Sequence, residues 1–351
     1  MSAAHQETPA SKLKIGIIGA GSIVRQRHLP GLAALDGVEI AAVCNSSYES
    51  SQRFCDEAAP HATPLKNWAE LLMLPELDIV WIGTQPYMHA PITLSALEAR
   101  RHVFCQARMA MNLEEAREMT AAAERSPELV TMLCPPPMGI PAGRHLVQLV
   151  SDGAIGAIRH LRLRSLSDAF LDPDAPAHWR QRRELSGLNV MTLGIYVEVL
   201  QRWFGPIAGV AALGKVFIPM RQGYRVEIPD VLNVVCEFEN GALGTLEFSS
   251  LAASAPGDAL EIYGAEGTLV YDFTSDTISL GRPGHPPAAL ETPPELRDQW
   301  SVEADFIAAV RDPGAPRPSP TFEEGLSYMR VVQAVADSID QRRHVTIAAN
   351  G

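Results

Sequence analysis

The chain has 351 residues, of which 46% are hydrophobic and 20% are charged. Domains average about 150 residues, so this length predicts two domains, and the composition excludes a disordered, low-complexity or fibrous protein. The formal net charge of −12 argues against nucleic acid and anionic membranes as partners, because affinity for phosphates comes from lysine and arginine.

The cysteines and the N-terminal segment indicate the compartment. The five cysteines lie scattered along the chain, at Cys44, Cys55, Cys105, Cys134 and Cys236. None has the CxxC spacing of a zinc or redox site, so we interpret them as buried thiols in a reducing compartment. Residues 1–14 contain no signal-peptide core, and no segment has the ~18 consecutive apolar residues of a membrane span. We expect a cytoplasmic protein.

Short apolar runs alternate with helical patterns in the first part of the chain, which is typical of a parallel sheet wound with helices. The predicted strands are Lys14–Ile18, Val38–Cys44, Asp78–Ile82, His102–Cys105 and Val130–Cys134. A helix is predicted over Asn112–Arg125, with Asn112 as its N-cap. This pattern predicts an α/β domain with a doubly wound parallel sheet, the Rossmann arrangement.

Four prolines stand in the eight residues 134–141, a segment that neither a helix nor a central strand accepts. We therefore place the domain boundary there, with a dinucleotide-binding domain at 1–134 and a domain for substrate binding and oligomerisation at 135–351. In the second domain, Asn240-Gly241 is a strong hairpin signal. The predicted elements are strands Val231–Phe238, Ala242–Phe248, Glu261–Gly264, Thr268–Phe273 and Val345–Ile347, and helices Trp300–Arg311 and Phe322–Arg342. They predict an α+β domain with a mainly antiparallel sheet.

The first predicted strand runs directly into a glycine turn and a helix. Glycines at such a turn let backbone N–H groups at the helix N-terminus approach a pyrophosphate. Gly19, Gly21, Ser22 and Ile23 are therefore predicted to bind a dinucleotide. Val24 replaces the third glycine of the GxGxxG pattern, so a tight turn without a ligand is the alternative.

The residues after the second strand bear on the choice of cofactor. A carboxylate at this place would bind the adenosine ribose and repel a 2′-phosphate. Asn45, Ser46 and Ser47 stand there instead, with no acid and no adjacent arginine. Asn45 and Ser46 are predicted to contact the cofactor, and the two hydroxyls favour NADP, with NAD as the alternative.

Further motifs accompany the glycine turn along most of the chain. They are His28-Leu29-Pro30-Gly31-Leu32, residues 84–91, 101–105, 112–116 and 153–156, His178-Trp179-Arg180, and Trp203-Phe204-Gly205. Together these motifs resemble the Gfo/Idh/MocA oxidoreductase family, which has an N-terminal Rossmann domain and a C-terminal domain with an open-faced sheet. The resemblance implies an NAD(P)-dependent oxidoreductase acting on a small hydroxyl or carbonyl compound, either sugar-like or a cyclic acid. It also implies a homodimer or homotetramer, because the free sheet face usually packs against another subunit.

This chain differs from the family at the residues that carry its chemistry. Most members have Glu-Lys-Pro after the fifth strand, whereas this chain has Gln106-Ala107-Arg108 and so lacks the lysine. Members usually have an aspartate and, four residues later, a histidine facing the substrate. Thr192 and Tyr196 occupy these two places here.

Hydride exchange with an alcohol needs an acid or a base for the hydroxyl proton. Tyr196 is predicted to be that group, with the Arg108 cation lowering its pKa and Thr192 bonding the substrate. The alternative is that Tyr196 and Thr192 are packing residues in a site that has lost catalysis. By position in the family, the further cofactor-binding residues are Thr84, His89, Gln106, Trp179 and Arg180, and His178 binds substrate. For His89, a capping role in its loop is an equal alternative.

Residues 159–183 contain six arginines and three aspartates. Guanidinium groups suit an anionic substrate such as a carboxylate, so Arg164 is predicted to bind substrate, with a solvated strand face as the alternative. We predict no metal, because no histidine has metal-ligand spacing with a cysteine or an aspartate.

The missing lysine keeps two other functions open. The chain could use a bound nicotinamide transiently, in a lyase, hydrolase or decarboxylase reaction without net redox. It could also be a non-catalytic regulator that binds a dinucleotide.

Overall fold

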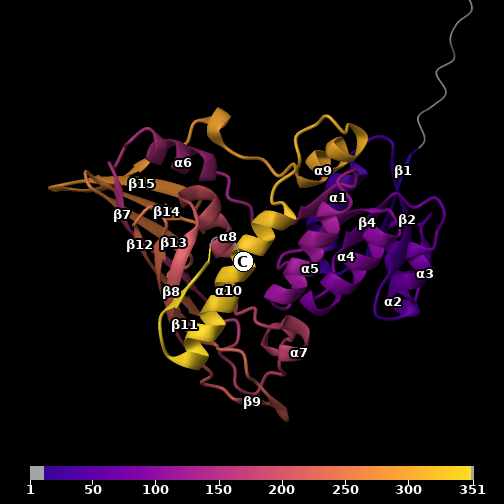
Figure 1. Ribbon diagram of the computed structural model, residues 1–351, viewed down its shortest axis with the longest axis horizontal. Helices are drawn as coiled ribbons and strands as arrows, with labels where there is room; N and C mark the ends of the chain where they lie inside the picture. The colour runs from indigo at the N-terminus through magenta and orange to yellow at the C-terminus, as the bar shows by residue number, and fades with distance from the viewer. Residues whose placement is uncertain (1–11, 349–351) are drawn as a thin grey trace, which may run out of the picture.

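The computed structural model describes residues 12–348. The first eleven residues of the segment in which we expect no signal peptide lie outside the described residues. Figure 1 shows two sheets, one from each half of the chain, with the long helix α10 (Phe322–Gln341) running between them. Among residues 12–348, no helix is both long and apolar enough to cross a bilayer.

The N-terminal sheet has six parallel strands in the order β3-β2-β1-β4-β5-β6. They are β1 Leu13–Ile18, β2 Val38–Cys44, β3 Thr63–Leu65, β4 Ile79–Ile82, β5 His102–Cys105 and β6 Thr131–Leu133. The five predicted strands are confirmed to within one residue at each end, whereas β3 was not predicted. The strand order reverses between β1 and β4, and the carboxyl ends of the strands meet at one edge, where such folds bind nucleotides.

Short helical elements connect these strands. They are η1 Val24–His28, α1 Leu29–Ala33, α2 Tyr48–Ala58, α3 Trp68–Leu72, η2 Pro86–Met88, α4 His89–Glu98 and α5 Leu113–Glu124. Asn112 caps α5 as predicted, because its side-chain oxygen accepts the Glu115 N–H at 2.9 Å. This confirms that the N-terminal half is a Rossmann-like α/β unit.

The C-terminal sheet has nine strands in the order β16-β15-β14-β13-β7-β12-β11-β8-β17. They are β7 Ile158–Leu166, β8 Ile207–Lys215, β11 Val231–Phe238, β12 Leu243–Ser249, β13 Ala259–Gly264, β14 Thr268–Asp272, β15 Thr277–Arg282, β16 His285–Leu290 and β17 Val345–Thr346. β7 and β12 pair in parallel, and the other neighbours pair antiparallel. The mainly antiparallel sheet and the hairpin at Asn240-Gly241 are therefore confirmed.

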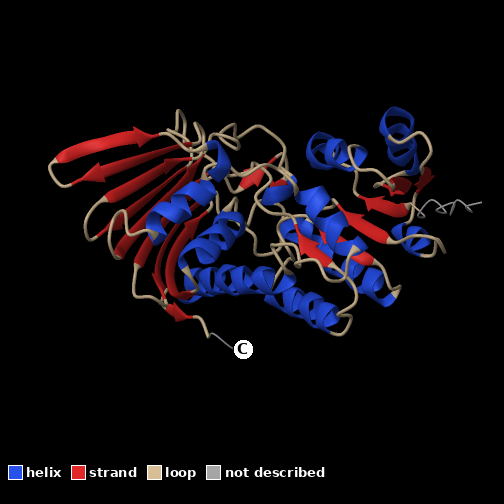
Figure 2. Ribbon diagram, turned by 90° about the horizontal axis from the view of Figure 1, so that it is seen from above, coloured by secondary structure: helices blue, strands red, loops and turns tan. Residues whose placement is uncertain are grey.

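Helices cover one face of the nine-stranded sheet and leave the other open (Figure 2). Strand side chains alternate between faces, so Leu232 and Val234 of β11 are buried while Val235 is 54% exposed.

The remaining elements of this half are α6 Gly143–Ser151, η3 Trp179–Gln181, α7 Arg183–Ser186, α8 Leu193–Phe204, β9 Met220–Arg221, β10 Tyr224–Arg225, η4 Pro294–Leu296 and α9 Val302–Arg311.

The last two helices return to the N-terminal half. α9 contacts α1, and its Phe306 packs edge-on against Trp81 of β4 and Phe104 of β5. α10 contacts both α5 and β8. The domain boundary at residue 134 stays a prediction, and the two halves share packing through α9 and α10.

Candidate active site

The glycine turn after β1 leaves a bare stretch of backbone at the carboxyl edge of the parallel sheet. Gly19 has a φ of +87°, and a Cβ there would lie 2.6 Å from the Thr84 nitrogen, so no side chain fits. Gly21 is exposed, and nothing lies within 4 Å of the place of its Cβ. Ser22 is exposed beside it. This combination of a tight turn and an open approach fits the pyrophosphate of a dinucleotide.

The residues after β2 support the glycine turn. The Asn45 side-chain oxygen accepts the Ala20 N–H at 2.7 Å, and its amide donates to the Ser50 carbonyl at 3.2 Å. The Ser47 hydroxyl caps α2, whereas Ser46 is exposed. Of the two hydroxyls considered for a 2′-phosphate, the Ser46 hydroxyl is the one that remains available.

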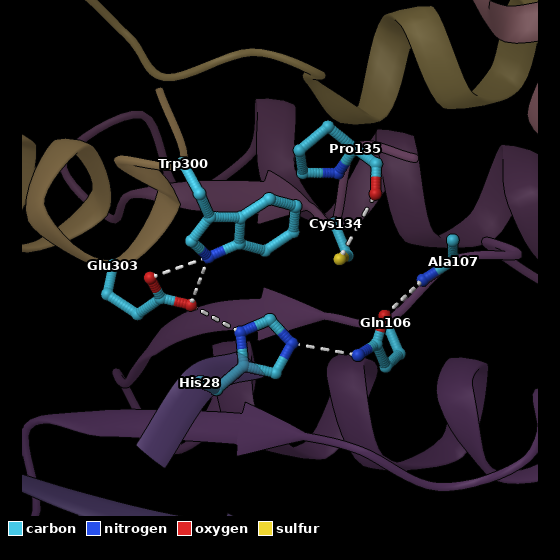
Figure 3. Close-up of polar contacts among 7 residues, drawn as sticks. All are labelled: His28, Gln106, Ala107, Cys134, Pro135, Trp300 and Glu303. Atoms are coloured by element: carbon cyan, nitrogen blue, oxygen red, sulfur yellow. Dashed lines mark hydrogen bonds and ion pairs between the residues drawn. The ribbon is translucent and has the colours of Figure 1, made fainter. Parts of the chain in front are cut away.

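A buried polar chain connects α9 to the residue after β5 (Figure 3). The Glu303 carboxylate lies 2.6 Å from Nδ1 of His28, and Nε2 of His28 lies 2.8 Å from the Gln106 amide nitrogen. The Gln106 oxygen accepts the Ala107 N–H at 3.0 Å. Trp300 donates its indole N–H to Glu303 at 2.9 Å. His28 is 0% exposed.

These contacts determine which nitrogen of the His28 ring carries the proton. Because the Gln106 oxygen is occupied by a backbone N–H, its amide nitrogen must face His28 and donate to it. Nε2 of His28 is then the acceptor, and the proton on Nδ1 points to Glu303. Through the Gln106 oxygen, the same set of contacts also holds the backbone N–H of Ala107 in place.

His89 links the loops after β4 and β5. Its Nδ1 lies 2.8 Å from the Arg108 carbonyl oxygen, and its Nε2 lies 3.0 Å from that of Thr84. The ring is fully buried, and burial lowers its pKa. This geometry favours the structural alternative over direct cofactor contact. The Thr84 hydroxyl is buried without a hydrogen-bond partner among the described residues.

Arg108 lies between the two halves of the chain and is only 4% exposed. Its Nη2 donates to the Met191 carbonyl, and its Nε is buried without a partner in the described part of the chain. Burial, followed by the charge of Arg180, lowers its pKa. The guanidinium carbon lies 6.0 Å from the centre of the Trp179 ring.

His178 caps the short helical turn η3, Trp179–Gln181, which lies beside Arg108. His178 Nδ1 accepts the Arg180 N–H at 3.2 Å, and the Gln181 side chain accepts the His178 N–H at 3.1 Å. The Arg180 guanidinium carbon lies 4.3 Å from the Trp179 ring centre. The structure thus brings together the three predicted residues of this motif and Arg108.

Tyr196 has a different partner from the one predicted. Its phenol is 1% exposed and donates a hydrogen bond to Asp258, the residue before β13. Burial, followed by the Asp258 charge, raises its pKa. The expectation that Arg108 lowers this pKa is wrong, because a carboxylate rather than a cation faces the phenol.

Thr192 joins the same polar group. Its hydroxyl lies 2.8 Å from that of Ser165, which donates to Asp258 at 3.0 Å. Asp258 is partly exposed. The Asp258 carboxylate is thus connected to Tyr196 directly and to Thr192 through Ser165, and it comes from the residue before β13 rather than from α8. No motif marked Asp258, since it lies 62 residues from Tyr196.

Arg164 lies on the opposite side of the C-terminal sheet. Side chains alternate along β7, so Ser165 faces the helices while Arg164 faces the open side. Its Nη1 pairs with Glu261 at 3.2 Å. This ion pair on the open strand face favours the alternative, a strand face whose arginines pair with acidic residues, over substrate binding by Arg164. Within residues 12–348, no cluster of three or more His, Cys, Asp or Glu side chains has a geometry suited to a metal.

Comparisons with known proteins agree with this architecture. Residues 13–133 match the family described as "Oxidoreductase family, NAD-binding Rossmann fold", and residues 144–270 match the GFO/IDH/MocA C-terminal domain. A levoglucosan dehydrogenase of Pseudarthrobacter phenanthrenivorans is 25% identical over 95% of this chain and 98% of its own length. A 1,5-anhydro-D-fructose reductase of Ensifer adhaerens is 30% identical over 92% of this chain and 96% of its own.

Solved structures show the same fold. A levoglucosan dehydrogenase in complex with NADH and L-sorbose superimposes with a TM-score of 0.84 at 21% identity, over 96% of this chain and 99% of that one. An oxidoreductase domain protein from Kribbella flavida gives a TM-score of 0.86 at 24% identity, over 96% and 100%. The chain belongs to the Gfo/Idh/MocA family of oxidoreductases.

Proposed function

We propose that the protein is an NAD(P)-dependent oxidoreductase that oxidises a hydroxyl group, or reduces a carbonyl group, of a small anionic sugar-like compound. The observation that carries the proposal is the open glycine turn at Gly21, on the same sheet edge as the loop that carries Arg108. Relatives of similar length are named as dehydrogenases and reductases of sugar derivatives, which supports this substrate class. The five buried, unpaired cysteines support activity in the cytoplasm.

The dinucleotide would lie along the carboxyl edge of the parallel sheet. Gly19, Gly21, Ser22 and Ile23 would hold the pyrophosphate, and Gln106 would position the loop at the nicotinamide. The bound nicotinamide supplies a hydride acceptor or donor. We propose NADP as the natural cofactor, because the exposed Ser46 stands where a carboxylate would repel the 2′-phosphate.

Thermal denaturation with NAD, NADP and their reduced forms tests the cofactor. A ligand bound by the folded state alone stabilises it by about 2.7 kcal/mol at a concentration of one hundred times Kd. We expect NADPH to raise the melting temperature more than NADH, and Ser46→Asp to reverse that order. If no dinucleotide shifts the transition, the proposed function is wrong.

For the proton, we propose Asp258 as the acid–base group, with Tyr196 and Ser165 as the residues that position it. Tyr196 was the candidate from the sequence, but its buried phenol already donates a hydrogen bond to Asp258. Asp258 is partly exposed and is the charged member of this group, so its carboxylate is the group that would exchange a proton with a substrate hydroxyl. Thr192 supports the arrangement through Ser165.

Asp258→Asn should lower kcat by about hundredfold or more, the usual effect of removing a general base, and leave the affinity for the reduced cofactor unchanged. Tyr196→Phe should lower kcat less, because it removes an orienting hydrogen bond and keeps the carboxylate. Full turnover by Asp258→Asn would show that a group other than Asp258 exchanges the proton with the substrate.

Ala107 at the usual lysine position favours a second candidate, a reaction that uses the nicotinamide without net redox. A third candidate is a regulator that binds dinucleotide and ligand but turns over neither. Absorbance of the reduced nicotinamide during a substrate screen separates the three. A net change supports the oxidoreductase, product without a net change supports the second candidate, and tight binding without any product supports the regulator.

A further inference from the structure

The arginines near the site differ in whether a carboxylate neutralises their charge. Three of the six between residues 159 and 183 are neutralised locally, as Arg162 with Glu247, Arg164 with Glu261 and Arg182 with Glu184. Arg108 and Arg180 form no ion pair with any carboxylate among residues 12–348. These two guanidinium groups converge on the ring of Trp179 from 6.0 Å and 4.3 Å.

The buried charge of Arg108 is incompletely compensated. One nitrogen donates to the Met191 carbonyl, and the fully buried Nε has no hydrogen-bond partner within residues 12–348. Nη1 also makes no hydrogen bond to the described residues and, unlike Nε, is not fully buried. Glu198 lines the same crevice as Arg108, but its carboxylate is paired with Arg202 at 2.7 Å. Burying a cation without a counter-charge is unfavourable, because the cation loses its hydration. We therefore expect a ligand that supplies the counter-charge.

Arg180 adds a second positive charge at the Trp179 ring, on the side that is exposed to solvent. Its side chain is exposed, and its charge acts on both Arg108 and His178. The His178 pKa is lowered by desolvation and then by the two arginines, so the imidazole adds no third charge at neutral pH. The cluster therefore combines two guanidinium groups and one aromatic ring, with Arg180 on its exposed side and Arg108 on its buried side.

We propose that Arg108 and Arg180 bind a carboxylate of the substrate, so that the protein acts on a sugar acid rather than on a neutral sugar. Arg180 offers a planar fork, and Arg108 offers the free Nη1, which together suit the two oxygens of a carboxylate. Both side chains come from loops, Arg108 from the loop after β5 and Arg180 from the short turn η3. The inference rests on the proposed function, because it takes the nicotinamide to lie beside Ala107.

The test compares binding of acids and neutral sugars to the full-length protein saturated with its reduced cofactor. The probes are hexuronates and hexonates of the gluco, galacto and manno series, each with the neutral aldose and the aldose 6-phosphate of the same configuration. Calorimetry should show at least one acid binding tenfold or more tightly than its neutral partner. A 6-phosphate that binds as tightly as the acid would overturn the assignment to a carboxylate.

Variants test which residues cause the tighter binding of the acid. Arg108→Gln and Arg180→Gln should each weaken binding of that acid by about tenfold to hundredfold, the effect of losing a hydrogen bond to a charged group, and leave the neutral sugar unaffected. Arg180 is exposed, so its variant tests the site even if Arg108→Gln folds poorly. Arg162→Gln is the matched control, because it removes an equal charge from the open sheet face, and it should bind the acid as the wild type does.

Two failures are distinguishable. If dinucleotides shift the melting temperature but acids and neutral sugars bind alike, the carboxylate site is wrong while the oxidoreductase proposal stands. If no dinucleotide binds, the oxidoreductase proposal fails first. An acid preference that survives both Arg108→Gln and Arg180→Gln would place the anion at other residues and overturn the inference.

Discussion

At the scale of single residues, Gln106 has its amide orientation fixed from both sides. Ala107 N–H holds its oxygen, and its nitrogen therefore donates to His28. Gln106→Glu would replace that donor with an acceptor, so the buried imidazole would stand between two carboxylates. Such an arrangement is satisfied only when both ring nitrogens are protonated.

We therefore expect Gln106→Glu to be less stable than the wild type at about pH 8, with the deficit narrowing at about pH 6. The sign follows because the folded variant requires an extra proton, so its stability falls as pH rises. Urea denaturation at both pH values measures it. Adding Glu303→Gln should restore stability at the higher pH. The new amide at position 303 would then donate to Nδ1 of His28, and Nε2 would donate to the new carboxylate at position 106, so every hydrogen bond of the series is reversed and no extra proton is needed. An unchanged loss of stability in the double variant would contradict this account.

At the scale of elements, α10 depends on a capping box at its start. The Thr321 hydroxyl accepts the Glu324 N–H at 3.2 Å, and the Glu324 carboxylate accepts the Thr321 N–H at 2.6 Å. α10 packs on both halves of the chain, so fraying of its first turn affects the whole molecule.

Thr321→Ala should lower the free energy of unfolding by about 1 kcal/mol, because a buried end of the helix loses a partner for its backbone. Thr321→Ser keeps a hydroxyl at the same place and should stay within a few tenths of a kcal/mol of the wild type. Equal losses in the two variants would show that the methyl group, rather than the cap, stabilises this end.

At the scale of the whole molecule, the open face of the nine-stranded sheet is the surface we expect to bury on assembly. Leu213, Val235 and Leu243 are 73%, 54% and 52% exposed on three adjacent strands of this face. Contiguous exposed apolar side chains mark interaction surfaces, which agrees with the homodimer or homotetramer predicted from the family resemblance.

Replacing Leu213 and Val235 together by lysine should convert the assembly to monomers, because it places charges within an apolar interface. Light scattering on a sizing column measures the mass. Met73→Lys is the control, since Met73 is 80% exposed at the end of α3 in the other half. A wild-type chain that already runs as a monomer would contradict the expectation.

The sequence by itself determined the two-part fold, the glycine turn, most strands and the α5 cap. These features depend on residues close together in the chain, since periodicity, turn chemistry and capping act over a few positions. The sequence did not reveal β3 of the first sheet, nor the strands β7, β8, β9, β10, β15 and β16 of the second half.

The tertiary structure decided which side chains meet. Glu303 reaches His28 across 275 positions, Asp258 reaches Tyr196 across 62, and neither pair leaves a local pattern in the sequence. Folding also separated the arginines, because the alternation of β7 turned Arg164 to the open face while Arg108 was buried between the two halves. Charge along the chain therefore predicted a basic site, and only the packing of distant segments decided which guanidinium groups are left without a counter-charge.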